Sequence, residues 1–418
     1  MSIASVLDGK IENKERWLRL AEQIEDFGLF AMILCLPLFE SPTTISLGIA
    51  FTGFLMKRVV TKDWQIEKGY FGWGLIAYFG AVFVSGLMAE DKYIGLRGAW
   101  DVLRFGSIFF LLINDYRQKE KLRVLFWLLI LSTLAGVLWG IAEFMTVSEQ
   151  TVVRIRNVGN GNHSGFYIAE ILCLTTSALI FHYANTRRIK IVLGVTHCIF
   201  LAGLFLTQSR SAFMGYGIFL IYLFFRDPRH RRQFAIMAVC CVLCFAVILG
   251  FRSSLQEKMV DTVTFECRYH FWRAAILAYA ENPVFGTGPN HYQRTDFERY
   301  GIPEKFRYSH PHSLPFKVLS ESGTVGVIAF VFMIYSFIRQ FRAPPEEKQA
   351  KIYFCGATGA MMIILGGGVF NTTLHHETAM IFSLLVGLSA AYGRTDVIKD
   401  EGISKKACPK KLIIEAES

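Results

Sequence analysis

Long apolar runs, separated by short polar and charged segments, make up most of this 418-residue chain. The runs approach the ~20 residues with which an α-helix crosses ~30 Å of membrane hydrocarbon. The pattern therefore predicts an all-α polytopic membrane protein with about 12 transmembrane helices. The expected spans are roughly 27–39, 43–56, 70–88, 95–114, 124–146, 164–184, 191–206, 211–225, 233–250, 323–338, 352–369 and 377–393.

The same pattern predicts how the chain is organised around the membrane. We expect a cytoplasmic N-terminal segment (1–26), transmembrane helices 1–9 (27–250), a long periplasmic loop with short helices (251–322), transmembrane helices 10–12 (323–393) and a cytoplasmic tail (394–418). The first two runs are short, so they form either two spans or one span with a re-entrant piece. The first segment is charged and lacks the apolar core of a cleaved signal peptide, so the first span is expected to stay as an anchor.

Composition and charge support this class and give an orientation. Hydrophobic residues make up 53% of the chain and aromatic residues 14%, which is typical of polytopic membrane proteins. Lysine and arginine favour cytoplasmic loops, and every second connection is rich in them, so both termini are expected in the cytoplasm. The net charge of +10 is dispersed between spans, which gives no reason to expect a nucleic-acid partner. The short outer connections hold few basic residues: Lys92, Arg97, Arg154, Arg156 and Arg210.

Arginine and histidine nevertheless gather at the outer ends of several expected spans. An arginine on the side where positive charge is disfavoured is expected to meet an anion, and its planar fork suits phosphate oxygens. Binding of lipid headgroups or local salt bridges is the alternative explanation. The residues concerned are Arg154, Arg156, Asn162 and His163 in VRIRNVGNGNHSG, Arg210 in LTQSRSAF, Arg268 near Trp272, and His310 and His312 in RYSHPHSLPF.

The long outer loop contains one expected helix and one glycine turn. YHFWRAAILAYAENP has apolar residues at helical spacing and a helix stop at Asn282-Pro283. In VFGTGPN, Gly286 and Gly288 let the backbone come close to another group. An ordinary loop turn is the other reading, and no preceding strand supports a nucleotide-binding fingerprint.

Three segments, in this order, resemble the O-antigen ligase and O-antigen polymerase superfamily. They are TQSRSAF at the outer start of a span, RYHFWRAAILAYAENPVFGTG in the long periplasmic loop, and HPHSLPFKVLSESGTVG entering the next span. The resemblance runs from about 150 to 340, and the twelve-span layout extends it over most of the chain. Ser313 stands where many members carry asparagine, and a serine is expected to cap the following helix equally well.

The resemblance implies a glycosyltransferase of lipopolysaccharide biosynthesis in the bacterial inner membrane, with a periplasmic active site. Such ligases move an O-antigen glycan from an undecaprenyl-pyrophosphate carrier to a hydroxyl of a lipid A–core sugar. A polymerase of the same superfamily uses the same donor with another glycan as acceptor, and the ligase is favoured because all three segments are present without extra domains. Donor, acceptor and membrane lipids are the expected partners, and no cofactor is expected.

The implied roles fall on particular residues. Arg210, Arg268 and, more weakly, Arg156 would bind the donor pyrophosphate and stabilise its charge as the glycosidic bond breaks. His312 would act as the catalytic general base for the acceptor hydroxyl, because an ordinary histidine pKa near 6.5 suits that task. The positive end of the helix that follows would keep His312 neutral. The supporting residues expected beside them are His310, Asn162 and Glu321.

A catalytic metal is an alternative explanation for the histidines. His291, His310, His312, His375 and His376 could in principle gather around a cation. Other lipid-linked glycosyltransferases hold their metal with a D-x-D-type pair in an outer loop, and the sequence AEDK (residues 89–92) lacks that spacing. Arginines also do the work of a divalent cation at a pyrophosphate, so we expect a metal-independent enzyme.

A twelve-span anion transporter is the alternative from a different class. A transporter would use intramembrane polar groups such as Asp101, Arg104, Glu143 and Glu170 as its ion path. Asp101 and Arg104 lie three residues apart on one expected helix, and mutual neutralisation is the favoured explanation for them. The sequence shows no inverted repeat and no paired broken helices, so we favour the enzyme.

Overall fold

The computed structural model describes residues 3–147, 150–183, 186–251, 263–303 and 310–406, and within these ranges the chain is helical without strands. The prediction of an all-α polytopic membrane protein is confirmed. Each expected apolar run falls mostly within a helix, although the runs 27–39 and 164–184 continue past the helix ends at Cys35 and Ile180. The parts of the expected outer loop at 252–262 and 304–309, and of the tail at 407–418, lie outside the described residues.

Seven helices in the described ranges are long and apolar enough to cross a membrane. They are α2 (Glu40–Thr61), α3 (Gly69–Met88), α5 (Lys119–Thr146), α6 (Gly161–Ile180), α7 (Arg187–Leu206), α12 (Leu314–Gln340) and α13 (Lys348–Met362) with its continuing π-helix η4 (Ile363–Gly367). The other expected runs lie in α1 (Ile3–Cys35), α4 (Lys92–Asp115), α8 (Arg210–Arg226), α9 (Arg231–Phe251) and α14 (His376–Lys406). Shorter elements are η1 (Pro228–His230), α11 (Val263–Glu281) and η2 (Tyr292–Arg294).

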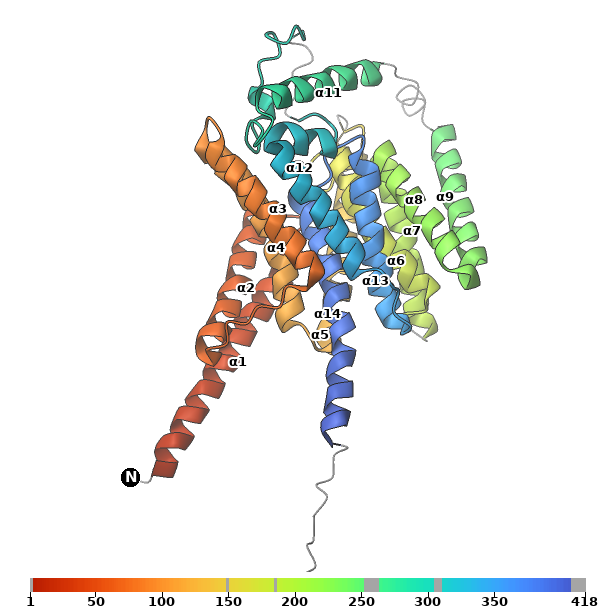
Figure 1. Ribbon diagram of the computed structural model, residues 1–418. Helices are drawn as coiled ribbons and strands as arrows, with labels where there is room; N and C mark the ends of the chain where they lie inside the picture. Colours follow the sequence, from red (N-terminus) through yellow and green to blue (C-terminus); the bar gives the residue numbers. More distant parts are fainter. Residues whose placement is uncertain (1–2, 148–149, 184–185, 252–262, 304–309, 407–418) are drawn as a thin grey trace, which may run out of the picture.

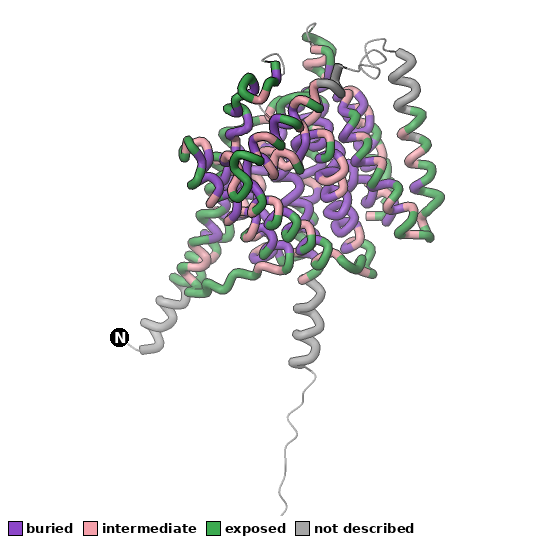
Figure 2. Tube along the Cα trace, turned by 45° about the horizontal axis from the view of Figure 1, so that its top comes forward, coloured by how far each residue is buried: buried purple, intermediate pink, exposed green. Residues whose placement is uncertain are grey.

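Helix α6 is the centre of the bundle. Almost all of its residues are buried, and it packs against α7, α8, α13 and α14. The helix also carries polar side chains, including His163, Glu170 and Thr175, which are buried among protein and kept away from lipid. Figure 2 shows this buried centre, with the exposed α9 at the edge of the molecule.

Helices α1 and α2 form a close antiparallel pair. Glycines allow the close approach, since a Cβ on Gly28 would lie 2.3 Å from the backbone nitrogen of Ala50, and one on Gly53 would lie 2.5 Å from that of Glu25. Small residues at helix contacts are typical of membrane helix packing. Because α2 is a continuous helix of 22 residues that is long and apolar enough to cross a membrane, it is not a short re-entrant piece.

Helix α11 lies across one end of the bundle, above α12 (Figure 1). It ends at Glu281, so the predicted stop at Asn282-Pro283 is confirmed. The start of α1 and the described end of α14 point away from α11, so both lie on the opposite side of the molecule (Figure 1). Which side faces the cytoplasm stays a prediction.

Helix α12 is broken, which the apolar pattern did not reveal. It begins at Leu314, before the expected span, and is interrupted at Gly323, whose φ of 61° and ψ of −162° are nearly reserved for glycine. The glycine turn pairs with the backbone at this break. Thr287 and Gly288 donate N–H groups to the carbonyls of Ser320 and Glu321, each at 2.9 Å. Such pairing satisfies backbone groups that a broken membrane helix leaves open.

The glycine turn is thus explained by its partner. Gly286 and Gly288 have φ values of 70° and 104°. A Cβ on Gly286 would lie 2.4 Å from the carbonyl carbon of Glu321. Ser85 of α3 donates a hydrogen bond to the carbonyls of Phe285 and Glu321, at 2.6 and 2.7 Å. The turn therefore joins α3 and the break in α12.

Candidate active site

Five histidines from three separate parts of the chain meet beneath α11, and we call them the histidine cluster. His163 comes from the first turn of α6, His310 and His312 precede α12, and His375 and His376 lie at the start of α14. Ring centroids are 4.3 Å apart for His310 and His312, 6.3 Å for His163 and His310, 4.9 Å for His163 and His375, and 3.8 Å for His375 and His376. Within the described ranges, no three His, Cys, Asp or Glu side chains are arranged to hold one metal ion.

The backbone of His312 is strained, with a φ of 48°. Residues other than glycine rarely adopt a positive φ, and the backbone strain of ~1–3 kcal/mol that it costs is found most often at functional sites. Helix α12 starts directly after it, as predicted, with proline in the first turn. The expectation that Ser313 caps this helix is wrong, because its side chain makes no capping hydrogen bond.

Burial, more than the helix end, determines the protonation of His312. The pKa of His312 is lowered to about 4, chiefly by burial and secondly by the positive charge of Arg268, while a hydrogen bond with Asn371 partly offsets the two. Burial also lowers the pKa of His310 to about 3, with added repulsion from His312 and Lys317. Both imidazoles are therefore neutral near pH 7.

Arg210 and Arg268 are brought together from two elements. Arg210 is the first residue of α8 and is exposed, while Arg268 lies half-buried on α11, 5.5 Å from the ring centroid of Phe370. Burial lowers the pKa of Arg268, and the charge of Arg210 lowers it further. Because Arg268 also acts on His312, three of the expected site residues lie in one electrostatic neighbourhood.

Arg156 and Asn162 occupy other positions. Arg156 is exposed, and its guanidinium lies 6.0 Å from the ring centroid of Phe39 and 5.7 Å from that of Trp139. These rings belong to the turn before α2 and to α5, so Arg156 sits on another part of the surface. Asn162 is half-buried beside His163, but Asn160 is the residue that caps α6, accepting the His163 N–H at 3.0 Å.

Glu321 is buried on α12 and holds the loop that follows the glycine turn. Its carboxylate accepts backbone N–H groups of Asn290 and Tyr292. The Tyr292 hydroxyl in turn donates to the carbonyl of Phe271 at 2.9 Å, and the Phe271 ring lies 5.5 Å from that of His312. Glu321 is thus connected to α11, the helix that carries Arg268.

Lys317 is a site residue that motif reading missed. It lies half-buried one turn into α12, and its Nζ is 3.9 Å from Glu321 Oε2. Burial lowers the pKa of His375 well below its usual value, followed by the charges of His376 and Lys317. The sequence signal that could have identified Lys317 is its position in the first part of the helix that follows His312.

Asp101 and Arg104 extend the histidine cluster to α4. Their expected pairing is loose, at 3.8 Å between Arg104 Nη2 and Asp101 Oδ1. The same Nη2 donates to His376 Nδ1 at 3.2 Å, and that nitrogen lies 3.6 Å from Asp101 Oδ1. A small cavity of about 50 Å³ adjoins these groups and is also lined by Lys317, Glu321 and His375.

An apolar groove of about 850 Å³ lies between α8 and α9. Arg210 lines it at the first residue of α8, and the rest of the groove is largely aromatic and aliphatic, including Phe213, Tyr216, Phe224 and Phe234. A groove with a cation at one end and apolar walls elsewhere suits an amphipathic molecule with an anionic head.

Residues 195–331 match the protein family described as O-antigen ligase. The match confirms the resemblance that the three sequence segments indicate. The matched range includes Arg210, Arg268, His310, His312 and Glu321, and it excludes Arg156, Asn162 and the histidines of α6 and α14. No curated protein sequence matches the chain.

Proposed function

Because residues 195–331 match the family described as O-antigen ligase, we propose that this protein is an O-antigen ligase of the bacterial inner membrane. It moves an O-antigen glycan from undecaprenyl pyrophosphate to a lipid A–core sugar hydroxyl on the periplasmic face. The family match supports a glycosyl-transfer enzyme that acts on lipid-linked glycans. The observation that carries the proposal is the position of Arg268, which is close enough to both His312 and Arg210 for their charges to interact.

The donor site consists of two arginines and an apolar groove. Arg210 and Arg268 repel each other in the free protein, and a pyrophosphate between them would relieve that repulsion. The N-terminus of α8 adds its partial positive charge next to Arg210. The undecaprenyl chain then lies in the groove between α8 and α9.

The reaction needs one proton acceptor and one stabilised leaving group. His312 takes the proton of the acceptor hydroxyl, whose oxygen forms a bond to the anomeric carbon of the glycan. The bond from that carbon to the pyrophosphate oxygen breaks, and the charge that grows on the leaving group is stabilised by Arg210 and Arg268. The bound pyrophosphate also raises the pKa of His312 above its value of about 4 in the free protein, which makes His312 a stronger base.

Glu321, Lys317 and the other histidines have positioning roles in this proposal. Glu321 holds the loop that connects to α11. The enzyme is metal-independent, because arginines stabilise the leaving group. Activity therefore survives treatment with EDTA, and restoration of an EDTA-inactivated enzyme by a divalent cation would contradict this part of the proposal.

Reconstitution with a labelled undecaprenyl-pyrophosphate glycan and separate acceptors tests the function. A ligase labels lipid A–core and leaves a free glycan acceptor unlabelled. Labelling of the glycan acceptor alone would identify a polymerase instead. If neither acceptor is labelled and proteoliposomes accumulate an anionic solute, the protein is a transporter and the proposal is wrong.

A further inference from the structure

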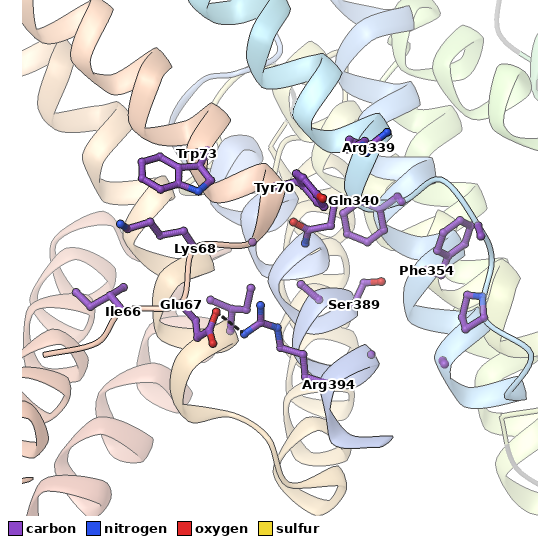
Figure 3. Close-up of a pocket in the computed structure, with 18 residues that line it drawn as sticks. Ile66, Glu67, Lys68, Tyr70, Trp73, Arg339, Gln340, Phe354, Ser389 and Arg394 are labelled. Carbon is purple, nitrogen blue, oxygen red and sulfur yellow. Dashed lines mark ion pairs between the residues drawn. The ribbon is translucent and has the colours of Figure 1, made fainter. Parts of the chain in front are cut away.

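A second cavity, of about 700 Å³, is shown with its lining residues in Figure 3. It is formed where α3 begins and where α12 ends, with part of α14 on the third side. Helix α3 spans 20 residues, or ~30 Å at 1.5 Å per residue. Because Ser85 near the far end of α3 bonds to Glu321, the cavity is about one membrane thickness from the candidate active site.

Cations and aromatic rings line this second cavity. Lys68 Nζ lies 4.2 Å from the ring centroid of Trp73, and the Arg339 guanidinium lies 5.5 Å from that of Tyr70. Both rings are more than half exposed. A third cation, Arg394, is paired with Glu67 at 3.1 Å (Figure 3). The lining therefore has a net positive charge at the level where Trp and Tyr mark a membrane interface.

The segment that carries Lys68 is fixed in place. Asn114 accepts the Glu67 N–H at 2.8 Å and donates to the Glu67 carbonyl at 3.0 Å. Gln340 of α12 accepts the Phe71 N–H at 2.8 Å. These bonds hold the chain just before and after Lys68, so the position of the cation is preorganised.

An apolar groove of about 270 Å³ adjoins the cavity and shares Ile66 and Lys68 with it. Its walls come from α2, α3 and α4 and include Phe54, Leu75, Phe79 and Phe110. Gly106 forms part of the wall, and a Cβ there would meet no atom within 4 Å. The groove is therefore open space beside a cation.

We propose that the cavity and the groove together bind one anionic membrane phospholipid. Its phosphate group contacts Lys68, and one acyl chain lies in the groove between α2 and α4. Basic pockets between membrane helices recognise anionic headgroups, because the phosphate meets both a positive charge and the polar interface. Lys68 lines both the cavity and the groove, so a single lipid molecule can place its headgroup in the cavity and an acyl chain in the groove.

Full-length protein in nanodiscs tests the proposal, with phosphatidylcholine as the bulk lipid and a minor fraction of phosphatidylglycerol. Native mass spectrometry counts the phosphatidylglycerol molecules that stay bound after release from the disc. The Lys68→Ala variant should retain several-fold less of it than the unaltered protein. Gly106→Phe should also lower retention, because it fills the groove while every charge remains.

Matched controls separate a specific site from general basic attraction. Arg187→Ala/Arg188→Ala removes two exposed charges at the start of α7, on the same side, and should retain the wild-type amount. Gly194→Phe adds a ring on α7 where a Cβ also meets nothing within 4 Å. Inorganic phosphate should not displace the lipid. Wild-type retention in either test variant, or an equal loss in either control, overturns the proposal.

Discussion

At the scale of single residues, His312 and Arg268 constrain each other. A buried imidazole beside a guanidinium is held neutral, with its pKa at about 4. A base with so low a pKa is weak, so the free protein does not have its full catalytic power. The donor pyrophosphate, by neutralising the arginines, restores basicity at the moment when both substrates are present.

The first prediction is a pH profile that differs between the free and the donor-bound enzyme. Values of kcat/KM should fall as the pH drops through about 4, since His312 becomes protonated there. Values of kcat, which report the enzyme–substrate complex, should fall at a higher pH because the bound anion raises that pKa. Initial rates across a pH series measure both. Identical midpoints for the two profiles would contradict the proposed effect of the bound pyrophosphate on the pKa of His312.

The second prediction separates His312 from its neighbour. His312→Ala should lower turnover by ~10²–10⁴-fold, as expected for loss of a general base, while binding of undecaprenyl pyrophosphate survives. His310→Ala should have a milder effect. It removes a ring whose centroid lies 4.3 Å from that of His312, but the general base itself remains. Single-turnover rates and lipid binding distinguish the two effects. A His312→Ala enzyme that keeps more than about a tenth of the rate would refute the base assignment.

The third prediction concerns the arginines. Arg268→Ala and Arg210→Ala should each lower transfer by ~10²–10³-fold, the range for loss of one positioned donor in a transition state. Lysine should substitute poorly, because a point charge lacks the bidentate fork.

The Arg156→Ala substitution should lower transfer much less, since Arg156 lies over Phe39 and Trp139. Arg154→Ala, at an exposed position, is the neutral control. Near-normal transfer by both alanine variants at 210 and 268 would contradict the pyrophosphate site.

At the scale of elements, the break in α12 determines the positions of several site residues. The first part of the helix carries Lys317 and Glu321, and the glycine turn pairs with its end. From that turn the chain continues to Tyr292, which bonds to α11. The orientation of Arg268 therefore depends on contacts that are distant from it in sequence.

The fourth prediction uses two glycines with similar backbones and different surroundings. Gly286 and Gly301 have φ values of 70° and 64°, but a Cβ meets Glu321 at 2.4 Å in one case and nothing within 4 Å in the other. Gly301→Ala should cost only backbone strain of ~1–2 kcal/mol. Gly286→Ala must also displace the turn from α12, so it should lower both the melting temperature and the transfer rate further. Equal effects in thermal unfolding and transfer assays would show that the pairing at the break is unimportant.

At the scale of the whole molecule, the apolar pattern was sufficient to predict the helices, because a membrane imposes length and polarity on every span. Local motifs led to the proposal of Arg210, Arg268 and His312 as site residues. The metal alternative already grouped His375 and His376 with His310 and His312, but the position of His163 beside them depends on how α6 and α14 pack. The break at Gly323 was also hidden, because the turn that completes it lies in another segment.

The last prediction belongs to the bundle as a whole and concerns acid. Folding holds His310 and His312 at pKa values of about 3 and about 4, whereas an unfolded histidine titrates near ~6.5. Between these values the unfolded chain binds more protons than the folded one, so stability is lost as the pH falls through that window. The melting temperature in detergent should therefore decline from about pH 7 to about pH 4, and His310→Gln should decline less steeply because it leaves one proton fewer to take up. A wild-type melting temperature that is constant over this range, or an unchanged slope in His310→Gln, would mean that the cluster is not held neutral by burial.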